Sequence, residues 1–194
     1  MTALRVPRKI TIAEYLLIEA NAEIKSEFYQ GEMFAMAGAS PRHNRVFSNL
    51  FLAIGKRLEG HECLPFPSDQ RLRIFAPGLY TYPDMMIACK KPVFDPRDEM
   101  SLINPTVIFE ILSPSTEAYD RGKKLDFYHQ VESAREIVHV WQDEPRVEVH
   151  LRTPHDDWGT LRCAEIGGEF HIPSIPLSIP LAEVYRNVDF SALE

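Results

Sequence analysis

The spacing of apolar positions changes along the chain between that of helices and that of strands. Apolar residues recur at helical spacing in residues 10–23, 40–60 and 115–131, with Thr11 and Ser40-Pro41 as helix starts. Shorter apolar or alternating runs predict strands, at residues 33–36, 63–67, 70–75, 80–89, 107–112, 136–142 and 146–152. The mixture predicts an α/β (α+β) fold.

Polar and proline-rich stretches separate these elements. Residues 90–105 read as a surface loop, and the last two strands should form a hairpin over residues 143–145. Prolines after Gly167-Gly168 predict extended edge or loop structure, followed by a short helix near residues 182–186. The chain shows no internal repeat or linker, and its 194 residues fit a single domain, residues 1–194.

Two carboxylates interrupt strands that are otherwise apolar. Glu110 stands in the middle of the run at residues 107–112, and Asp84 follows Pro83 and precedes the apolar residues 85–88. If the two strands are neighbours and the acids share a face, the carboxylates converge. Like charges at short range need a cation or a shared proton between them. A hard ion such as Mg²⁺, bound by one or two carboxylates, meets that need.

The helix predicted at residues 115–131 offers a cation for the same face. At about 100° per residue, Leu125, Tyr128 and Val131 form an apolar stripe. Lys124 falls inside this stripe, whereas Lys123 points away from it. A lysine that packs against a sheet needs an anionic partner, which the acid pair can supply.

Charge and cysteine content narrow the class of protein. A net charge of −7 argues against coating nucleic acid through bulk charge, but leaves room for a local site with bound cations. No run approaches the roughly 18 apolar residues of a membrane span, and no signal-peptide cleavage pattern follows the N-terminal basic residues. Cys63, Cys89 and Cys163 are widely spaced and odd in number, so we expect neither a disulfide framework nor a zinc site. A reducing cytoplasm is the expected location.

Five stretches of the sequence together resemble a known family. They run in order from about residue 10 to 186 and read EFYQGEMFAMAGASPRHNRV, FPSDQRLRI, GLYTYPDMMIAC, PTVIFEILSPSTEAYDRGKKLDFY and QDEPRVEVH. Pro83-Asp84 followed by Glu110-Ile111-Leu112 resembles the PD-(D/E)XK nuclease superfamily, and the chain is similar to its Uma-two-type putative restriction endonucleases. The resemblance implies a restriction-endonuclease-like fold, a mixed sheet flanked by helices.

The resemblance also implies roles for individual residues. Asp84 and Glu110 would bind the metal, with the backbone carbonyl of Ile111 as a further ligand. Leu112 stands where the superfamily usually has its lysine, and Lys124 from the following helix would replace it. Less directly, other residues would line the same cleft, namely His43, Glu27, Glu32 and Gln70.

The implied activity is hydrolysis of phosphodiester bonds in DNA. Mg²⁺, or Mn²⁺ as a substitute, would assist the reaction. A homodimer is expected, because cutting both strands of a duplex calls for two sites related by symmetry. A second hypothesis is a catalytically inactive module that binds nucleic acid or protein, which the acidic charge and Leu112 favour. A third is an enzyme that acts on a smaller phosphate or sugar substrate.

Each candidate residue also has a plainer interpretation. Glu110 could reach solvent at a sheet edge or pair with an arginine, Pro83-Asp84 could be a simple turn, and Lys124 could extend to solvent from a helix edge. His43 could be a helix N-terminal residue without chemistry. Arg71 and Arg73 could contact phosphates or lie on an exposed sheet face. The remaining histidines and aromatics are interpreted as structural or core residues, namely His139, His150, Tyr80, Tyr82, Phe109 and Phe127.

Overall fold

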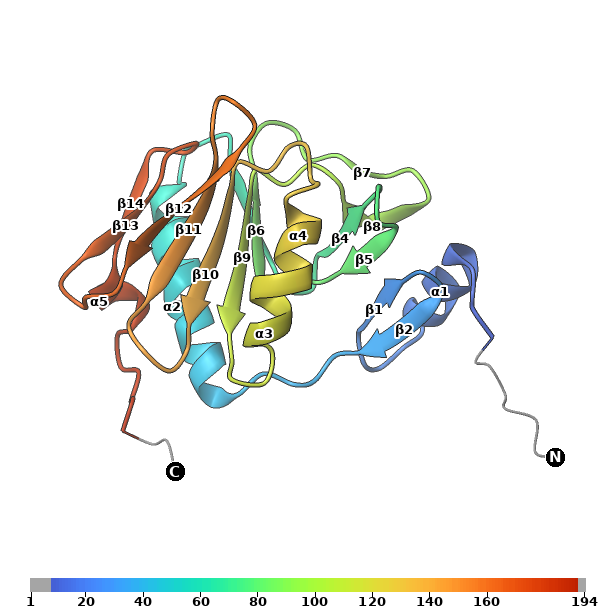
Figure 1. The fold of residues 1–194 in the computed structure, drawn as a ribbon, viewed down its shortest axis with the longest axis horizontal. Helices are drawn as coiled ribbons and strands as arrows, with labels where there is room; N and C mark the ends of the chain where they lie inside the picture. The colour runs from blue at the N-terminus through green and yellow to red at the C-terminus, as the bar shows by residue number, and fades with distance from the viewer. Residues whose placement is uncertain (1–7, 192–194) are drawn as a thin grey trace.

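The computed structural model describes residues 8–191, in which mixed sheets pack with short and long helices (Figure 1). Residues 1–7, the start of the stretch inspected for a signal peptide, and residues 192–194 lie outside the described residues. Within the described range, no helix has the combination of length and apolar character that crossing a membrane requires. The predicted mixture of helices and mixed sheets is confirmed.

One sheet, here called the central sheet, carries the strand with Glu110. Its strands follow the order β12 (Trp158–Cys163), β11 (Val147–Arg152), β10 (Glu136–Trp141), β9 (Val107–Leu112), β6 (Met85–Ala88) and β3 (Leu64–Pro67). The predicted hairpin is β10–β11, and β12 is a strand that the sequence pattern did not predict. β9 runs parallel to β10 and antiparallel to β6, so the sheet is mixed.

Helices cover both faces of the central sheet, with α2 behind it and α3 and α4 in front in the view of Figure 1. α2 (Pro41–Arg57) begins at the predicted cap, where the Ser40 side chain accepts a hydrogen bond from the backbone of His43. α5 (Leu181–Val184) and the hairpin of β13 (Glu169–Ile172) and β14 (Leu177–Pro180) pack on the α2 side. α4 (Leu125–Tyr128) packs on the opposite face.

The burial of β9 on both faces fixes the direction of Glu110. Phe109 and Ile111 pack in the core with α2, whereas Ile108 packs with Phe127 and Tyr128 of the α4 side. Because side chains alternate along a strand, Glu110 faces α4. It is therefore a buried carboxylate beneath a helix, rather than a glutamate at a sheet edge.

The other sheet, here called the side sheet, contains the N-terminal part of the chain. Its strands follow the order β2 (Glu32–Ala35), β1 (Ser26–Tyr29), β5 (Leu79–Thr81), β4 (Arg71–Ile74), β8 (Asp98–Leu102) and β7 (Phe94–Asp95). α1 (Ile12–Glu19), capped by Thr11 as predicted, packs Tyr15 against Phe28 and Tyr80. Figure 1 shows α1, β1 and β2 as an arm at one end of the molecule.

The segment predicted as one strand at residues 80–89 belongs to both sheets. β5 pairs in the side sheet and β6 in the central sheet, with Pro83-Asp84 between them. Proline cannot donate a backbone hydrogen bond to a ladder, so the strand is interrupted there. Asp84 therefore lies where the chain passes from one sheet to the other.

The prediction of a surface loop at residues 90–105 is wrong, because β7 and β8 form an antiparallel pair there. Arg71 and Arg73 are buried rather than on an exposed face. Arg71 pairs with Asp98 at 2.6 Å, and Arg73 pairs with Asp95. Asp95 and Asp98, which suggested a loop, neutralise the two arginines of β4, and this pairing lets the charges be buried.

The helix predicted at residues 115–131 is broken into shorter pieces. α3 (Glu117–Tyr119) is followed by a π-helical turn, η1 (Asp120–Lys124), and then by α4. Gly122 departs from helical backbone angles inside η1. This kink turns the chain over the face of β9 that carries Glu110.

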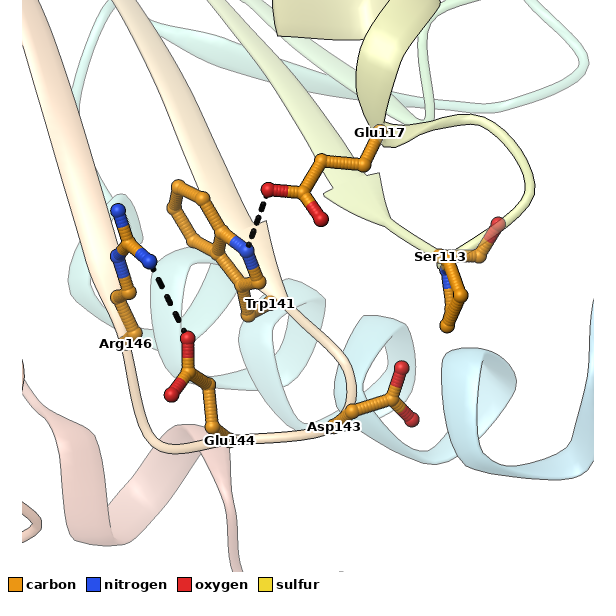
Figure 2. Close-up of a pocket in the computed structure, with 7 residues that line it drawn as sticks. Ser113, Glu117, Trp141, Asp143, Glu144 and Arg146 are labelled. Carbon is orange, nitrogen blue, oxygen red and sulfur yellow. Dashed lines mark hydrogen bonds and ion pairs between the residues drawn. The ribbon is translucent and has the colours of Figure 1, made fainter. Parts of the chain in front are cut away.

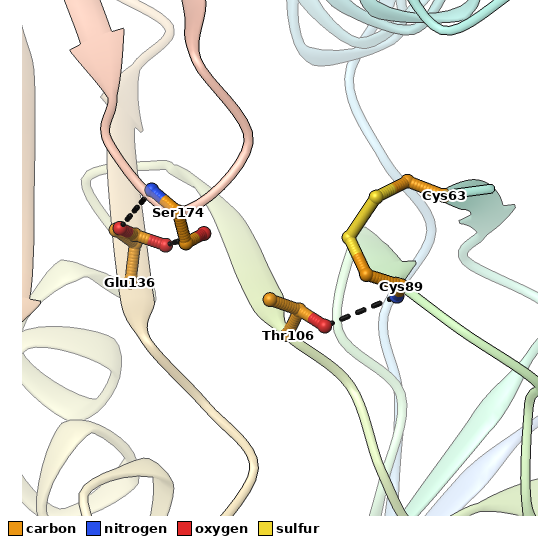
Figure 3. The surroundings of a disulfide bond; sticks show 5 residues. All are labelled: Cys63, Cys89, Thr106, Glu136 and Ser174. Atoms are coloured by element: carbon orange, nitrogen blue, oxygen red, sulfur yellow. Dashed lines mark hydrogen bonds between the residues drawn. A yellow bond between two sulfur atoms is a disulfide. The ribbon is translucent and has the colours of Figure 1, made fainter. Parts of the chain in front are cut away.

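The cysteine prediction is wrong for one pair, because Cys63 and Cys89 form a disulfide (Figure 3). β3 and β6 are antiparallel with Leu64 opposite Ala88, so the next residues outward, Cys63 and Cys89, stand opposite each other. The sequence alone does not show this pairing, since 26 positions separate the two cysteines. Cys163 is free.

The disulfide predicts a measurable contribution to stability. Opening a loop of 26 residues should lower the free energy of unfolding by about 3.5 kcal/mol, because the reduced unfolded chain is less constrained. Urea denaturation with and without a reductant measures this difference. A Cys63→Ala/Cys89→Ala variant is the control, whose stability should not respond to reductant. Three free thiols in the unreduced, denatured protein, instead of one, would contradict the pairing.

Candidate functional site

A cavity of about 660 Å³ lies between the β1–β2 hairpin and the α4 face of the central sheet. Residues 34–40, which lead from β2 into α2, form one wall, and residues from the end of β9 through α3 form another. The carboxylates and the lysine singled out in the sequence lie between these walls, namely Asp84, Glu110, Glu27 and Lys124.

The pairing of β6 with β9 brings the first two carboxylates together. Met85 stands opposite Phe109 in this antiparallel pair, so the next residues in the same register are Asp84 and Glu110. Directly opposed residues of an antiparallel pair share one face of the sheet. Asp84 Oδ2 accepts a hydrogen bond of 2.7 Å from the backbone N–H of Ile111, and His43 Nε2 lies 3.2 Å from the same oxygen.

Glu110 is held from the helix side. The Tyr128 hydroxyl donates to Glu110 Oε1, and Lys124 Nζ lies 2.9 Å from the same oxygen. Within residues 8–191, the recorded hydrogen bonds and ion pairs of these two acids use Asp84 Oδ2 and Glu110 Oε1. Asp84 Oδ1 and Glu110 Oε2 are therefore the oxygens left to bind a ligand.

Lys124 joins carboxylates from three different elements. Its Nζ lies 3.4 Å from Glu27 Oε1 on β1 and 3.5 Å from Asp120 Oδ1 on η1, in addition to its contact with Glu110. Glu27 is fixed further by the Tyr119 hydroxyl, which donates to its Oε2 at 3.0 Å. The lysine is buried, whereas its neighbour Lys123 is exposed.

Burial and a surplus of negative charge shift the pKa values in this cluster. Burial raises the pKa of Glu110 well above its usual range, and the Lys124 ammonium offsets this only in part. Burial likewise raises the pKa of Asp120. Burial opposes the charged form of Lys124, but Glu110, Glu27 and Asp120 outweigh it and raise the pKa of the lysine well above its usual range. The cluster thus favours a bound cation or proton.

The donor set of the cavity fits a hard divalent cation. Ile111 N–H points toward Asp84, and a strand residue directs its C=O to the same side as its N–H, so the Ile111 carbonyl faces the acid pair as well. No cluster of three or more His, Cys, Asp or Glu side chains within residues 8–191 could hold a metal by itself. Two carboxylates and a carbonyl, completed by waters and phosphate oxygens, are the kind of site that Mg²⁺ uses.

Two residues named from the sequence lie away from this cluster. The Gln70 side chain donates to the backbone carbonyl of Met100, and Glu32 is exposed; neither lines the cavity. The partners Asp120 and Tyr128 follow from Lys124 by helical i, i±4 spacing, a local signal that the sequence does carry. Tyr119 has no such signal, since its contact with Glu27 joins residues 92 positions apart.

The histidines interpreted as structural lie beside the site. His139 stands next to Glu110 in the parallel pairing of β10 with β9, and its Nδ1 lies 3.2 Å from His150 Nε2. Burial lowers the pKa of His139 to about 3, so this imidazole is neutral near pH 7.

A second hollow, of about 380 Å³, adjoins the cavity at Ser113 and Pro114 (Figure 2). Its polar groups are occupied by one another: the Trp141 indole N–H donates to Glu117 at 3.2 Å, and Arg146 pairs with Glu144 at 3.3 Å. The Arg146 guanidinium also lies over the Trp141 ring, 3.9 Å from its centroid. The three acids that line this hollow each have a partner, since Asp143 pairs with Arg42 in addition to the contacts of Glu117 and Glu144, so the larger cavity is the better candidate site.

The Lys124 cluster predicts a large effect of one substitution on stability. Lys124→Met should lower the free energy of unfolding by about 3–5 kcal/mol, because it leaves buried carboxylates without their cation. Urea denaturation measures the effect. Lys123→Met is the matched control, since Lys123 is exposed with its Nζ 4.3 Å from the centroid of the Tyr29 ring. Equal stabilities of the two variants would contradict the arrangement.

Comparisons with known proteins place the chain among relatives that share most of its length. It is 35% identical over 158 residues to "Uncharacterized protein sll1609" of Synechocystis sp. (strain ATCC 27184 / PCC 6803 / Kazusa), covering 81% of this chain and 89% of that protein. It is 30% identical over 185 residues to "Uncharacterized protein slr1290" of the same organism, covering 94% of each.

A solved structure has the same fold. It is the crystal structure of "a putative nuclease belonging to DUF820" from Anabaena variabilis ATCC 29413, which matches with a TM-score of 0.72 and 18% sequence identity. The match covers 92% of this chain and 98% of that chain. At this identity the likeness shows the shared fold.

The sequence model of the Uma2 family matches residues 12–182, a range that includes Asp84, Glu110 and Lys124. The description of this family is "Putative restriction endonuclease". The resemblance seen in the five sequence stretches is thereby confirmed, and the chain belongs to the Uma2 family.

Proposed function

We propose that the protein is an endonuclease that hydrolyses phosphodiester bonds of DNA with the help of Mg²⁺, for which Mn²⁺ can substitute. The metal would be bound by Asp84, Glu110 and the carbonyl of Ile111. The Lys124 ammonium would stabilise negative charge on the reacting phosphate. The family description and the printed title of the Anabaena variabilis structure, both of which refer to nucleases, support this class of reaction.

One observation carries the proposal: Asp84, directly before β6, continues the register of β6 with β9 opposite Glu110, and each acid has one oxygen left in a shared cavity. Lys124 Nζ reaches the same place, 2.9 Å from Glu110. Leu112 therefore does not argue for an inactive protein, since a lysine from η1 supplies the ammonium group that the strand lacks.

Neighbouring side chains would hold the two metal-binding acids in place. His43 and the Ile111 N–H hold Asp84 Oδ2, which leaves Oδ1 directed to the ligand. Tyr128 fixes Glu110 in the same way. A bound divalent cation would stabilise charge on the phosphate and lower the pKa of the attacking water.

Lys124 would supply a fixed positive charge. Its contacts with Glu27 and Asp120 are longer than its contact with Glu110, so one N–H of the ammonium can turn to a phosphate oxygen while the Glu110 contact stays. Donors that are already positioned stabilise developing anionic charge at little reorganisation cost.

The assembly and location remain predictions. If the substrate is duplex DNA, we expect a homodimer, since cutting both strands needs two sites. Light scattering of the purified protein measures the oligomeric state. A cytoplasmic location is checked by cell fractionation. The Cys63–Cys89 disulfide is a feature more common in oxidising compartments, so the cysteine content no longer supports the cytoplasm.

A cleavage assay tests the proposed activity. The protein should cut DNA in Mg²⁺ or Mn²⁺ and stop when EDTA removes the metal. Asp84→Asn and Glu110→Gln should each reduce the rate by at least about 100-fold, since even loss of an outer partner of a metal ligand costs 10–100-fold.

Matched exposed acids provide the controls. Asp126→Asn on α4 and Glu132→Gln make the same chemical changes on exposed side chains outside the cavity, and their rates should equal that of the unmodified protein. If Asp84→Asn and Glu110→Gln cut as fast as these controls, the proposed site is wrong.

A further inference from the structure

Two aromatic side chains at the cavity are exposed, unlike the aromatic residues of the core. Phe34 is 48% exposed and Tyr119 is 39% exposed, and both line the cavity. The aromatics that the sequence suggested as core residues are buried, namely Tyr80, Tyr82, Phe109 and Phe127. The cavity wall therefore presents aromatic surface that is not buried in the core of the protein.

Phe34 belongs to the face of the β1–β2 hairpin that points to the acid cluster. It stands opposite Glu27 in the hairpin register, so the two side chains share a face. Tyr29, also on that face, packs on Phe127 of α4 with a centroid distance of 5.0 Å. Phe34 has no ring partner among residues 8–191, so its surface is open to a ligand.

Tyr119 comes from α3, on another wall of the cavity. Its hydroxyl donates to Glu27 Oε2 at 3.0 Å, which fixes the ring beside the same glutamate that Phe34 opposes. Glu27 in turn lies 3.4 Å from the Lys124 ammonium. The two rings thus come from different elements, line the same cavity and lie beside the same glutamate.

The reactive groups lie deeper than these rings. The side chains of Glu110 and Lys124 are 5% and 6% exposed, and that of Asp84 is 19% exposed. Duplex DNA is a stiff rod, with a persistence length of about 50 nm, so its backbone does not bend into such a recess without cost. A single strand is flexible, and the cavity of about 660 Å³ is in the range that holds small organic ligands of nucleotide size.

We propose that the site takes an unpaired DNA strand, whose bases stack on Phe34 and Tyr119 while its phosphate enters the recess in which Asp84, Glu110 and Lys124 lie. The inference rests on the proposed function and adds the form of the substrate. Aromatic stacking suits an acidic cavity, because it contributes affinity without positive charge on the protein. Every base has a flat face, so this contact does not require a particular sequence.

Binding measurements test the stacking without relying on cleavage. A fluorescein-labelled 20-mer DNA strand is titrated with the protein, and anisotropy is recorded with Ca²⁺ in place of Mg²⁺. Phe34→Ala and Tyr119→Ala should each weaken binding at least about fivefold, the lower end of what loss of one base–aromatic stack costs. Tyr119→Phe keeps the ring and should bind within about twofold of the unmodified protein.

Phe75→Ala is the matched control for the loss of a ring. Phe75 is 55% exposed, lies outside the cavity and packs with Arg73, so its removal should leave binding unchanged. If Phe34→Ala and Tyr119→Ala bind the strand as tightly as Phe75→Ala, the inference is wrong.

Cleavage then separates the inference from the proposed function. The same 20-mer is supplied in Mg²⁺ as a single strand, as a full duplex and as a duplex with a central unpaired bubble. The single strand and the bubble should be cut at least about tenfold faster than the duplex, because a paired strand must first be separated. Equal rates would overturn the inference and leave the proposed function standing. Failure to cut any of the three would overturn the proposed function, while the anisotropy series still decides whether an unpaired strand stacks on the two rings.

Discussion

The antiparallel pairing of β6 with β9 is the constraint on which the candidate site depends. It sets Asp84 opposite Glu110, which no spacing in the sequence could do alone. Two carboxylates so placed repel each other unless a positive charge lies between or beside them. The rest of the site supplies that charge: η1 carries Lys124 over the sheet, and Tyr128 on α4 holds the glutamate from the same side.

The Lys124 cluster serves both the fold and the proposed chemistry. Carboxylates from β1, β9 and η1 meet at one ammonium group, so the hairpin, the central sheet and the helical segment are joined at this point. The same contacts hold the groups in place before a ligand arrives, which is the preorganisation that catalysis needs. The surplus of negative charge, with raised pKa values of Glu110 and Asp120, leaves the cluster suited to a further cation.

The site forms where the two sheets meet, and this position shapes what it can bind. The chain leaves the side sheet after β5 and enters the central sheet at β6, with Asp84 at the crossing. The β1–β2 hairpin, part of the side sheet, contributes Glu27 to the acid cluster and Phe34 to the cavity wall. The polar and the aromatic parts of the site are therefore neighbours because one hairpin provides both.

The sequence by itself determined the local features of the protein. The Ser40 cap, the buried strand around Glu110 and the placement of Lys124 on the stripe of Tyr128 follow from short-range patterns, whose physical causes act within a few residues. The family follows from matching stretches along most of the chain, which the sequence also carries. Only the tertiary structure decided the features that join distant segments. Partners 22 to 27 positions away form the Cys63–Cys89 disulfide and bury Arg71 and Arg73 beside acids from the segment predicted to be a loop. The rings of Phe34 and Tyr119 are exposed because no element within the described residues covers them. Charge neutralisation and burial depend on which residues are neighbours in space, and the pairing of strands determines those neighbours.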